Sequence, residues 1–246
     1  MNHSFIIGKR VIKELVKDKK LFILSVVAPL ILIYFLKLFM DGMPDNYPVA
    51  RYVMPISAFI VHFLSFLLCS IILVQERTSG TLERMFVAGF KKISIIFGYI
   101  IGYFGLATLQ AIIVLAETIW LMQLDYSLDV IALLFLTIWL LAIVSVMLGI
   151  LISTFARHEG HIIPFIPLII LPTVFLSGLL IDLEDLPLWA EYLGMILPFH
   201  YANNIIQELI TSTIDIDIIY TNFCYLIIFM IALFLIASKT LKDTQN

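Results

Sequence analysis

Long apolar runs alternate with short polar segments along this chain of 246 residues. Each of six runs approaches or exceeds the ~20 apolar residues that an α-helix needs to cross a bilayer core of ~30 Å. The pattern therefore predicts an all-α integral membrane protein, with six transmembrane helices in a single domain over residues 1–246. The predicted spans cover residues 21–39, 52–74, 93–122, 130–155, 162–180 and 218–238.

The segment before the first span, residues 1–20, has the pattern of an amphipathic helix. Its apolar positions share one face at helical spacing: Phe5, Ile12, Leu15 and Val16. Its cations occupy the remaining positions: Lys9, Arg10, Lys13, Lys17 and Lys20. We expect an interfacial helix with its apolar face in lipid and its cations near lipid phosphates. The alternative is a solvated basic arm that precedes the first span.

Prolines interrupt the pattern around the fifth span. Because Pro164, Pro167 and Pro172 remove backbone hydrogen bonds, we expect this span to be bent and partly covered by neighbouring helices. Residues 182–217 mix acids with aromatic side chains and are too broken to span a membrane. Four residues mark this segment: Pro187, Trp189, Pro198 and Tyr201. It is predicted to form two short outer re-entrant helices, because irregular backbone at membrane depth must be covered by protein.

Composition supports a lipid environment. The chain is 62% hydrophobic and 13% charged, with a mean hydropathy of +1.07, which leaves too little polar surface for a soluble globule. Cys69 and Cys224 both lie within apolar runs and are predicted to be buried thiols. Of the 15 lysines and arginines, 13 fall on one side of the predicted topology, including Arg157, Lys239 and Lys242. The positive-inside rule therefore places both termini in the cytoplasm.

A charged segment, residues 76–92, separates the second and third spans. Gly80 favours a turn, and Thr81 is predicted to cap a short helix in which Glu83 suits the helix dipole. Met85, Phe86 and Val87 then supply an apolar contact for a soluble partner. The alternative is a charged connector with no partner.

The same segment resembles the cytoplasmic signature of type-2 (export) ABC transporter permeases. The residues that carry this resemblance are Glu76, Arg77, Gly80, Thr81, Leu82, Glu83 and Arg84. The later order Ser177-Gly178, Leu186-Pro187-x-Trp189 and Leu197-Pro198-x-x-Tyr201-Ala202 resembles that family too. The resemblance implies that residues 76–92 form a coupling helix seated on an ATPase subunit. It also implies a dimer of six-span subunits, in a homodimer or heterodimer, joined to two cytoplasmic ATPase subunits.

The sequence contains no GxxxxGK[ST] pattern, so ATP hydrolysis by a P-loop is not expected in this chain. We expect no cofactor or metal in it, with ATP and Mg²⁺ bound by the partner ATPase subunit. The expected contacts are that ATPase, a second permease subunit and membrane lipid, and not nucleic acid.

Two polar positions within the third span, Gln110 and Glu117, are candidates for a substrate pathway. An intramembrane carboxylate costs ~2.5 kcal/mol or more at the bilayer centre. The alternative is a structural hydrogen bond, since Trp120 places Glu117 near the membrane interface. In the same span, Gly98 and Gly102 permit close helix approach, either within the subunit or across a dimer.

Other constellations are weaker. His158, Glu159 and His161 suggest a metal site, but the spacing is not HExxH and favours a charged turn. An acidic group could bind a cation or simply cap and solvate: Asp182, Glu184 and Asp185. His62 and His200 carry no assigned role.

Together, the pattern of spans and the family resemblance imply the permease subunit of an ATP-driven exporter in a bacterial plasma membrane. An apolar lining favours a hydrophobic or amphipathic cargo: a drug, an antimicrobial or a lipophilic peptide. A polysaccharide or lipid-linked glycan exporter is an alternative. Two others are an ion-driven secondary transporter that uses Glu117 and a membrane enzyme built on the His158 loop.

Overall fold

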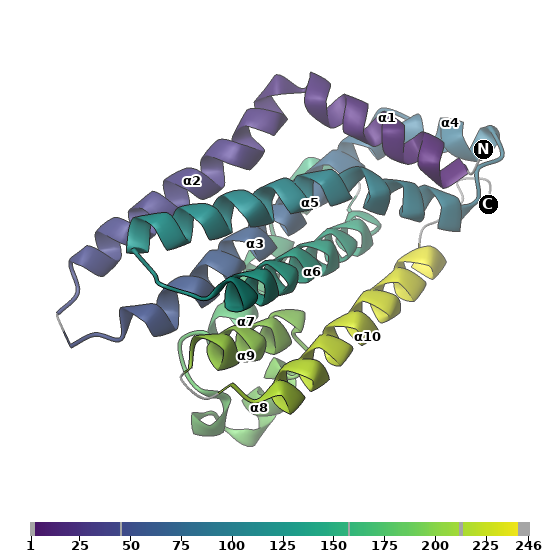
Figure 1. The fold of residues 1–246 in the computed structure, drawn as a ribbon. Helices are drawn as coiled ribbons and strands as arrows, with labels where there is room; N and C mark the ends of the chain where they lie inside the picture. Colours follow the sequence, from purple (N-terminus) through teal and green to yellow (C-terminus); the bar gives the residue numbers. More distant parts are fainter. Residues whose placement is uncertain (1–2, 45, 157, 212–213, 241–246) are drawn as a thin grey trace.

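A computed structural model describes residues 3–44, 46–156, 158–211 and 214–240, without the side chains of residues 20 and 21. Arg157, Lys242 and the Lys20 side chain, used above for orientation, lie outside this described part. The described elements are helices (Figure 1): α1 His3–Lys17, α2 Lys19–Asp41, α3 Val49–Thr78, α4 Thr81–Val87, α5 Lys92–Met122, α6 Leu128–Ser153, η1 Glu159–His161, α7 Phe165–Leu176, η2 Leu183–Asp185, α8 Leu188–Gly194, α9 Pro198–Ile210 and α10 Ile216–Thr240.

Six helical stretches in the described residues are long and apolar enough to cross a membrane, which confirms the predicted fold class. They correspond to α2, α3, α5, α6, α7 with the preceding η1, and α10. With 30 and 31 residues, α3 and α5 exceed the ~20 residues that the hydrocarbon core requires. Their ends can therefore extend past the membrane and carry polar contacts.

The core of the bundle lies between α3, α6 and α9. Helices α3 and α6 pack together, and α9 packs against both of them and against α10. Side chains such as Met54, Leu141 and Phe199 are fully buried there. In contrast, few residues of α2, α7 and α10 are buried, as expected for helices at the lipid boundary.

The fifth span is shorter than predicted. Helix α7 has 12 residues and contains Pro172, while Pro164 lies directly before it. Neighbouring segments cover this span only in part, as expected: the buried residues are Ile162, Thr173, Ser177 and Leu179, and the rest of residues 162–180 are half-buried or exposed. Helix α7 contacts mainly α8 and only the edge of α9, so its Leu168 and Leu171 remain exposed.

Residues 182–217 contain two short helices, as predicted. Pro187 precedes α8 and Pro198 is the first residue of α9, where a missing backbone N–H costs nothing. Trp189 is exposed, and the Tyr201 hydroxyl donates to the Met195 carbonyl oxygen at 2.8 Å. Their position in the outer leaflet stays a prediction.

An ion pair and a hydrogen bond tie this region to α3. The Arg51 guanidinium lies 2.6 Å from Asp182, and the Gln207 amide donates to the Arg51 carbonyl oxygen at 3.0 Å. Asp182, one of the three acids considered for a cation site, therefore already has a cationic partner.

Helix α1 packs along the beginning of α5. Ile7 lies against Gly98 and Val11 against Gly102, so the two helices run in the same direction at this contact. A Cβ atom at either glycine would approach these side chains to about 2.5 Å, closer than packing allows. Of the two alternatives for these glycines, the structure supports packing within the subunit.

The faces of α1 differ from the prediction. The buried face consists of Ile7, Gly8, Val11 and Leu15. Leu15 therefore packs on protein, whereas Phe5, Ile12 and Val16 remain exposed. The sequence pattern could not separate these two apolar strips, because both lie on adjacent parts of one helix surface. The placement of α1 in the membrane interface stays a prediction.

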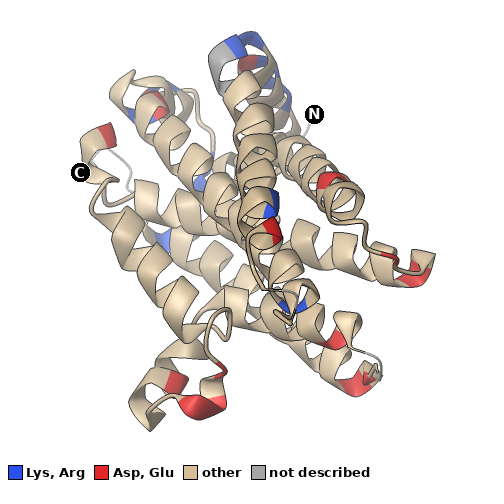
Figure 2. Cartoon of the chain, turned by 90° about the vertical axis from the view of Figure 1, so that its left-hand side faces the viewer, with Lys and Arg blue, Asp and Glu red and all other residues tan. Residues whose placement is uncertain are grey.

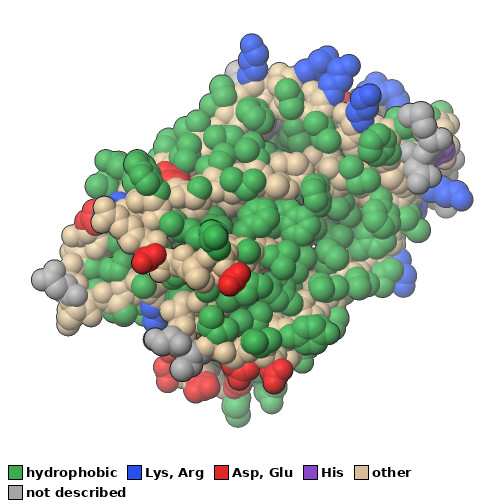
Figure 3. Space-filling view, in the orientation of Figure 1, with side chains coloured by type: hydrophobic (Ala, Val, Ile, Leu, Met, Phe, Trp, Pro, Cys, Tyr) green, Lys and Arg blue, Asp and Glu red, His purple; other side chains and the backbone are tan. Residues whose placement is uncertain are grey.

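Most charged side chains of the described residues lie towards the two ends of the bundle. Figure 2 shows long helices that are free of charge over most of their length, and Figure 3 shows a side surface on which hydrophobic side chains predominate. Most of the described lysines and arginines gather around α1, α4 and the start of α5, which we call the basic end. Loops rich in aspartate and glutamate occupy the opposite, acidic end. Helix α1 and the last turn of α10 both lie at the basic end (Figure 1).

Candidate functional site

The candidate site lies at the basic end, where α3 turns into α4. Gly80 connects the two helices with φ 71°, a left-handed conformation that glycine adopts without a Cβ penalty. The prediction that Thr81 caps α4 is wrong, because Gly80 occupies the cap position and Thr81 is the first helical residue. The Thr81 hydroxyl instead lies 2.9 Å from the Ser79 hydroxyl and accepts from Arg84 at 3.0 Å.

Helix α4 has one buried and one exposed face. Leu82 and Met85 are buried among side chains of α1, α3 and α5. The expectation that Met85 faces a partner protein is therefore wrong, because the short helix docks on its own bundle through this residue. The exposed face carries Glu83, Arg84 and Val87, and the Val87 side chain is 78% exposed.

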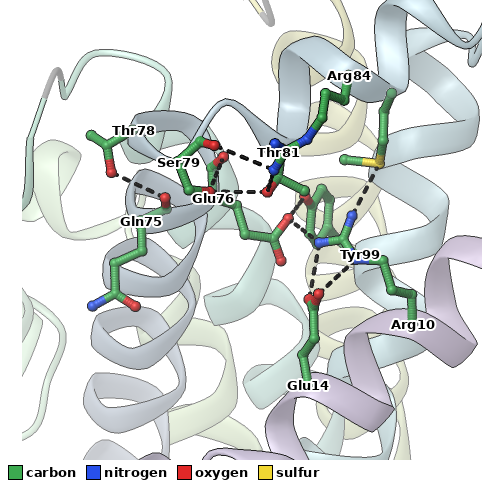
Figure 4. A network of polar contacts seen from close by, with 10 residues as sticks. Arg10, Glu14, Gln75, Glu76, Thr78, Ser79, Thr81, Arg84 and Tyr99 are labelled. Carbon is green, nitrogen blue, oxygen red and sulfur yellow. Dashed lines mark hydrogen bonds and ion pairs between the residues drawn. The ribbon is translucent and has the colours of Figure 1, made fainter.

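A polar network joins α4 and its neighbours behind this exposed face (Figure 4). The Arg10 guanidinium of α1 lies 2.6 Å from a carboxylate oxygen of Glu76, in the last turn of α3. The Tyr99 hydroxyl of α5 donates to the same Glu76 oxygen. Arg10 also pairs with Glu14 at 2.9 Å and contacts the Met85 sulfur at 3.5 Å. The network therefore links α1, α3, α4 and α5.

Burial determines the electrostatics of the network. Burial alone would lower the pKa of Arg10, but its hydrogen bonds to Glu14 and the nearby charge of Glu76 raise that pKa above its ordinary value. Arg10 is therefore a permanent cation. Glu76 is only 9% exposed, so it depends on Arg10 and Tyr99 in place of water.

A cavity of about 260 Å³ adjoins the network between α1, the end of α3 and the start of α4. Its polar lining includes Glu14, Asp18, Gln75, Glu76 and Thr81. The carboxylates around it come from α1, from the residue that follows α1 and from α3. The described residues contain no group of three His, Cys, Asp or Glu side chains that could hold a metal ion. The arrangement suits mechanical linkage between helices.

Arg77 points to a different part of the bundle from Glu76. Its guanidinium donates to the carbonyl oxygens of Thr154 at 3.1 Å and Ala156 at 3.4 Å. These carbonyls follow the end of α6, where helix geometry leaves acceptors without partners. Arg77 therefore fixes α3 to α6.

The predicted coupling residues thus divide into three sets. Glu83 and Arg84 are exposed. The turn and its flank are half-buried at Gly80, Thr81 and Phe86, and the inward-facing members are Glu76, Arg77, Leu82 and Met85. Sequence reasoning placed Arg10 near lipid phosphates together with Lys9, Lys13 and Lys17, whereas only the three lysines of this set are exposed. It missed Tyr99 and Glu14. The sequence signal that could have indicated such a network was Glu76 itself, because a carboxylate at the end of an apolar span needs a partner.

The candidates for a substrate pathway lie in different surroundings. Gln110 is 1% exposed, accepts from the Ser65 hydroxyl at 2.9 Å and donates to the Ser25 carbonyl oxygen at 3.1 Å. These bonds favour the structural alternative for Gln110. Glu117 is half-buried, and one of its carboxylate oxygens is buried without a hydrogen-bond partner among the described residues.

The histidines have local partners. His62 lies 2.7 Å from the Ser145 hydroxyl inside the bundle. His200 contacts the Ser177 carbonyl oxygen at 3.3 Å and the Asn204 amide at 3.1 Å. The rings of His158 and His161 lie 3.8 Å apart in the loop after α6.

The fold is that of a multi-pass α-helical membrane protein. At its basic end, the α3–α4 turn is held to the bundle by buried side chains and a polar network. Residues 3–211 match the family described as ABC-2 type transporter, so the chain belongs to that family. Its relatives are ABC transporter proteins, and the bacterial ones carry the word permease in their names.

Three relatives illustrate the similarity. The probable multidrug ABC transporter permease YbhR of Escherichia coli is 27% identical over 62% of this chain and 41% of its own length. ABC transporter G family member 20 of Dictyostelium discoideum is 28% identical over 72% of this chain and 24% of its own length. The linearmycin resistance permease protein LnrN of Bacillus subtilis is 22% identical over 57% of this chain and 36% of its own length. The chain therefore matches less than half the length of each relative.

Proposed function

We propose that this chain is the membrane-spanning permease subunit of an ATP-driven exporter. The observation that carries the proposal is the design of the α3–α4 turn. Its outer face presents Glu83, Arg84 and Val87 at the basic end, while its inner face is tied to the bundle through Leu82, Met85 and Glu76. A soluble subunit seated on the outer face can thus displace several spans together.

The proposed assembly contains two permease subunits and two cytoplasmic ATPase subunits, which bind ATP and Mg²⁺. The gathering of cations at the end that carries α1 and the last turn of α10 (Figure 3) supports a cytoplasmic location for that end. The proposed location is a bacterial plasma membrane. No catalytic step is assigned to this chain.

The proposed cargo is a hydrophobic or amphipathic compound. The names of two relatives refer to multidrug transport and to linearmycin resistance. The helices at the bundle boundary present apolar side chains, which suits a cargo that partitions into lipid. The proposed direction is outward, from the leaflet at the basic end.

Charge reversal at Glu83 tests the coupling role. The tagged chain is purified from native membranes to identify an ATPase with a Walker A motif, and both are reconstituted into vesicles. We expect Glu83→Lys to lower the transport of linearmycin or a lipophilic dye per ATP hydrolysed, with the chain still folded. The matched control is Glu184→Lys, which reverses an exposed charge of the same kind at the acidic end.

Two results count against the proposal. One is purification of the chain without any ATPase. The other is a Glu83→Lys variant that transports as efficiently per ATP as the Glu184→Lys control.

A further inference from the structure

An apolar hollow of about 200 Å³ lies between α1, α2 and α5, apart from the polar network. Helices α1 and α2 meet at a corner beside α5 (Figure 1). The hollow has an apolar lining, which includes Ile12 and Val16 of α1, Phe22 of α2 and Gly105, Leu106 and Leu109 of α5. In a membrane protein such a hollow is filled by lipid or by another apolar group.

Gly105 makes the hollow deep enough for a narrow occupant. The earlier glycines of α5 are covered by α1, Gly98 by Ile7 and Gly102 by Val11. A Cβ atom at Gly105 would meet nothing within 4 Å. The row of glycines therefore continues past the helix contact and leaves an open channel along α5. A single hydrocarbon chain fits a channel of this kind better than a protein helix does.

Cations line the adjacent surface of α1. Lys9 and Lys13 are exposed, and at helical spacing they flank Ile12 and Val16 of the hollow. Residues three or four positions apart lie side by side on a helix surface. An occupant with one apolar chain and an anionic group can thus use both surfaces at once.

We propose that this hollow binds an acyl chain of an anionic phospholipid from the leaflet at the basic end, with the phosphate group held by Lys9 and Lys13. The charge complementarity selects an anionic headgroup, and the apolar lining selects the chain. A bound lipid would also cover Gly105 and brace the corner between α1 and α2. This proposal does not depend on what the protein transports.

Native mass spectrometry of the full chain tests the proposal. The protein is purified with any subunits that accompany it, delipidated in detergent and titrated with phosphatidylglycerol or phosphatidylcholine. We expect the first phosphatidylglycerol to bind more tightly than phosphatidylcholine. Gly105→Leu should weaken this first binding step, because its side chain fills the channel. The matched control is Ala116→Leu, which places the same side chain at an exposed position of the same helix.

Two further variants separate the chain site from the headgroup site. Neutralising one cation near an anionic lipid reduces affinity roughly fivefold, so Lys13→Gln should lower phosphatidylglycerol binding by about that factor. The control Lys239→Gln removes an exposed lysine from α10 and should change nothing. Ile12→Gln makes the hollow polar from α1, without any change in α5, and should weaken the binding of both lipids.

The proposal is overturned by any of three results. These are equal first binding of the two lipids by the unmodified chain, unchanged binding in both Gly105→Leu and Ile12→Gln, or an equal loss in Gly105→Leu and Ala116→Leu.

Discussion

The ion pair between Arg10 and Glu76 allows a sharp test of how the α3–α4 turn is held. Its two partners are unequal: the Glu76 side chain is 11% exposed, whereas that of Arg10 is 28% exposed. Arg10 also keeps a second carboxylate partner, Glu14, at 2.9 Å. Loss of Arg10 therefore leaves an almost buried carboxylate with one hydrogen bond, while loss of the Glu76 charge leaves Arg10 still paired.

This asymmetry sets the expected magnitudes. Removal of one partner from a buried ion pair costs about 3–5 kcal/mol, and the partial exposure of Arg10 places Arg10→Gln near the lower limit, at about 3 kcal/mol. In Glu76→Gln the amide oxygen can still accept hydrogen bonds, so we expect a loss of about 1–2 kcal/mol. The double variant removes the stranded charge, so it should cost about 2 kcal/mol less than the sum of the single variants.

The assay is unfolding by sodium dodecyl sulfate in mixed micelles, followed by circular dichroism, with the free energy of unfolding as the readout. The matched control is the pair Lys37 and Asp41, four residues apart at the surface end of α2. Its cycle of Lys37→Gln and Asp41→Asn should give a coupling energy of only about 0.3–0.5 kcal/mol.

Two outcomes would refute the reasoning. One is an Arg10/Glu76 coupling energy no larger than that of the control pair. The other is a smaller loss for Arg10→Gln than for Glu76→Gln, because that order contradicts the burial of the carboxylate.

Three further predictions concern packing, an exposed ion pair and a histidine. Gly98→Leu should destabilise the fold by about 1–3 kcal/mol through overpacking, and Gly105→Leu, in open space, should cost far less in the same assay. Asp182→Asn should cost less than about 1 kcal/mol, and the difference should shrink at high salt, because its partner Arg51 is also exposed; a larger cost would mark a buried pair. Burial lowers the pKa of His200, against the opposing hydrogen bond to the Ser177 carbonyl, so the unfolded chain binds its proton more readily. Stability should therefore be complete above the ordinary pKa of about 6.5 and fall below it, and His200→Gln should flatten this dependence between pH 7.5 and 5.5.

The sequence predicted the spans well because lipid imposes a simple requirement on each of them. The first span, predicted over residues 21–39, belongs to α2, Lys19–Asp41, and the last, predicted over residues 218–238, belongs to α10, Ile216–Thr240. Backbone polar groups inside the bilayer must form their hydrogen bonds within the chain, so a long apolar run in lipid is expected to be a helix. The prolines at the start of α8 and α9 marked those helix boundaries for a local reason too, because a missing backbone N–H costs nothing at the beginning of a helix.

The orientation of short segments could not be predicted in the same way. Helix α4 has seven residues, too few for a periodic pattern to identify its buried side. The contact of Met85 with Arg10 joins residues that are 75 positions apart in the chain. The inward direction of Glu76 likewise depends on where α1 packs, and the residues next to Glu76 in the sequence do not indicate that packing.

The two attachments of α1 differ in kind, and this difference bears on the proposed coupling. Its contact with α5 is close apolar packing over Gly98 and Gly102, which tolerates little relative movement. Its contact with the α3–α4 turn combines apolar side chains with charged groups around a cavity of about 260 Å³, and the cavity leaves room for the charged side chains to rearrange. A displacement of the turn should therefore move α1 and α5 as one body, while the adjustment occurs at Arg10 and Glu76. Under the proposed function, the ion pair controls how much of the displacement reaches the spans, and its loss should reduce transport per ATP hydrolysed more than it reduces ATP hydrolysis itself.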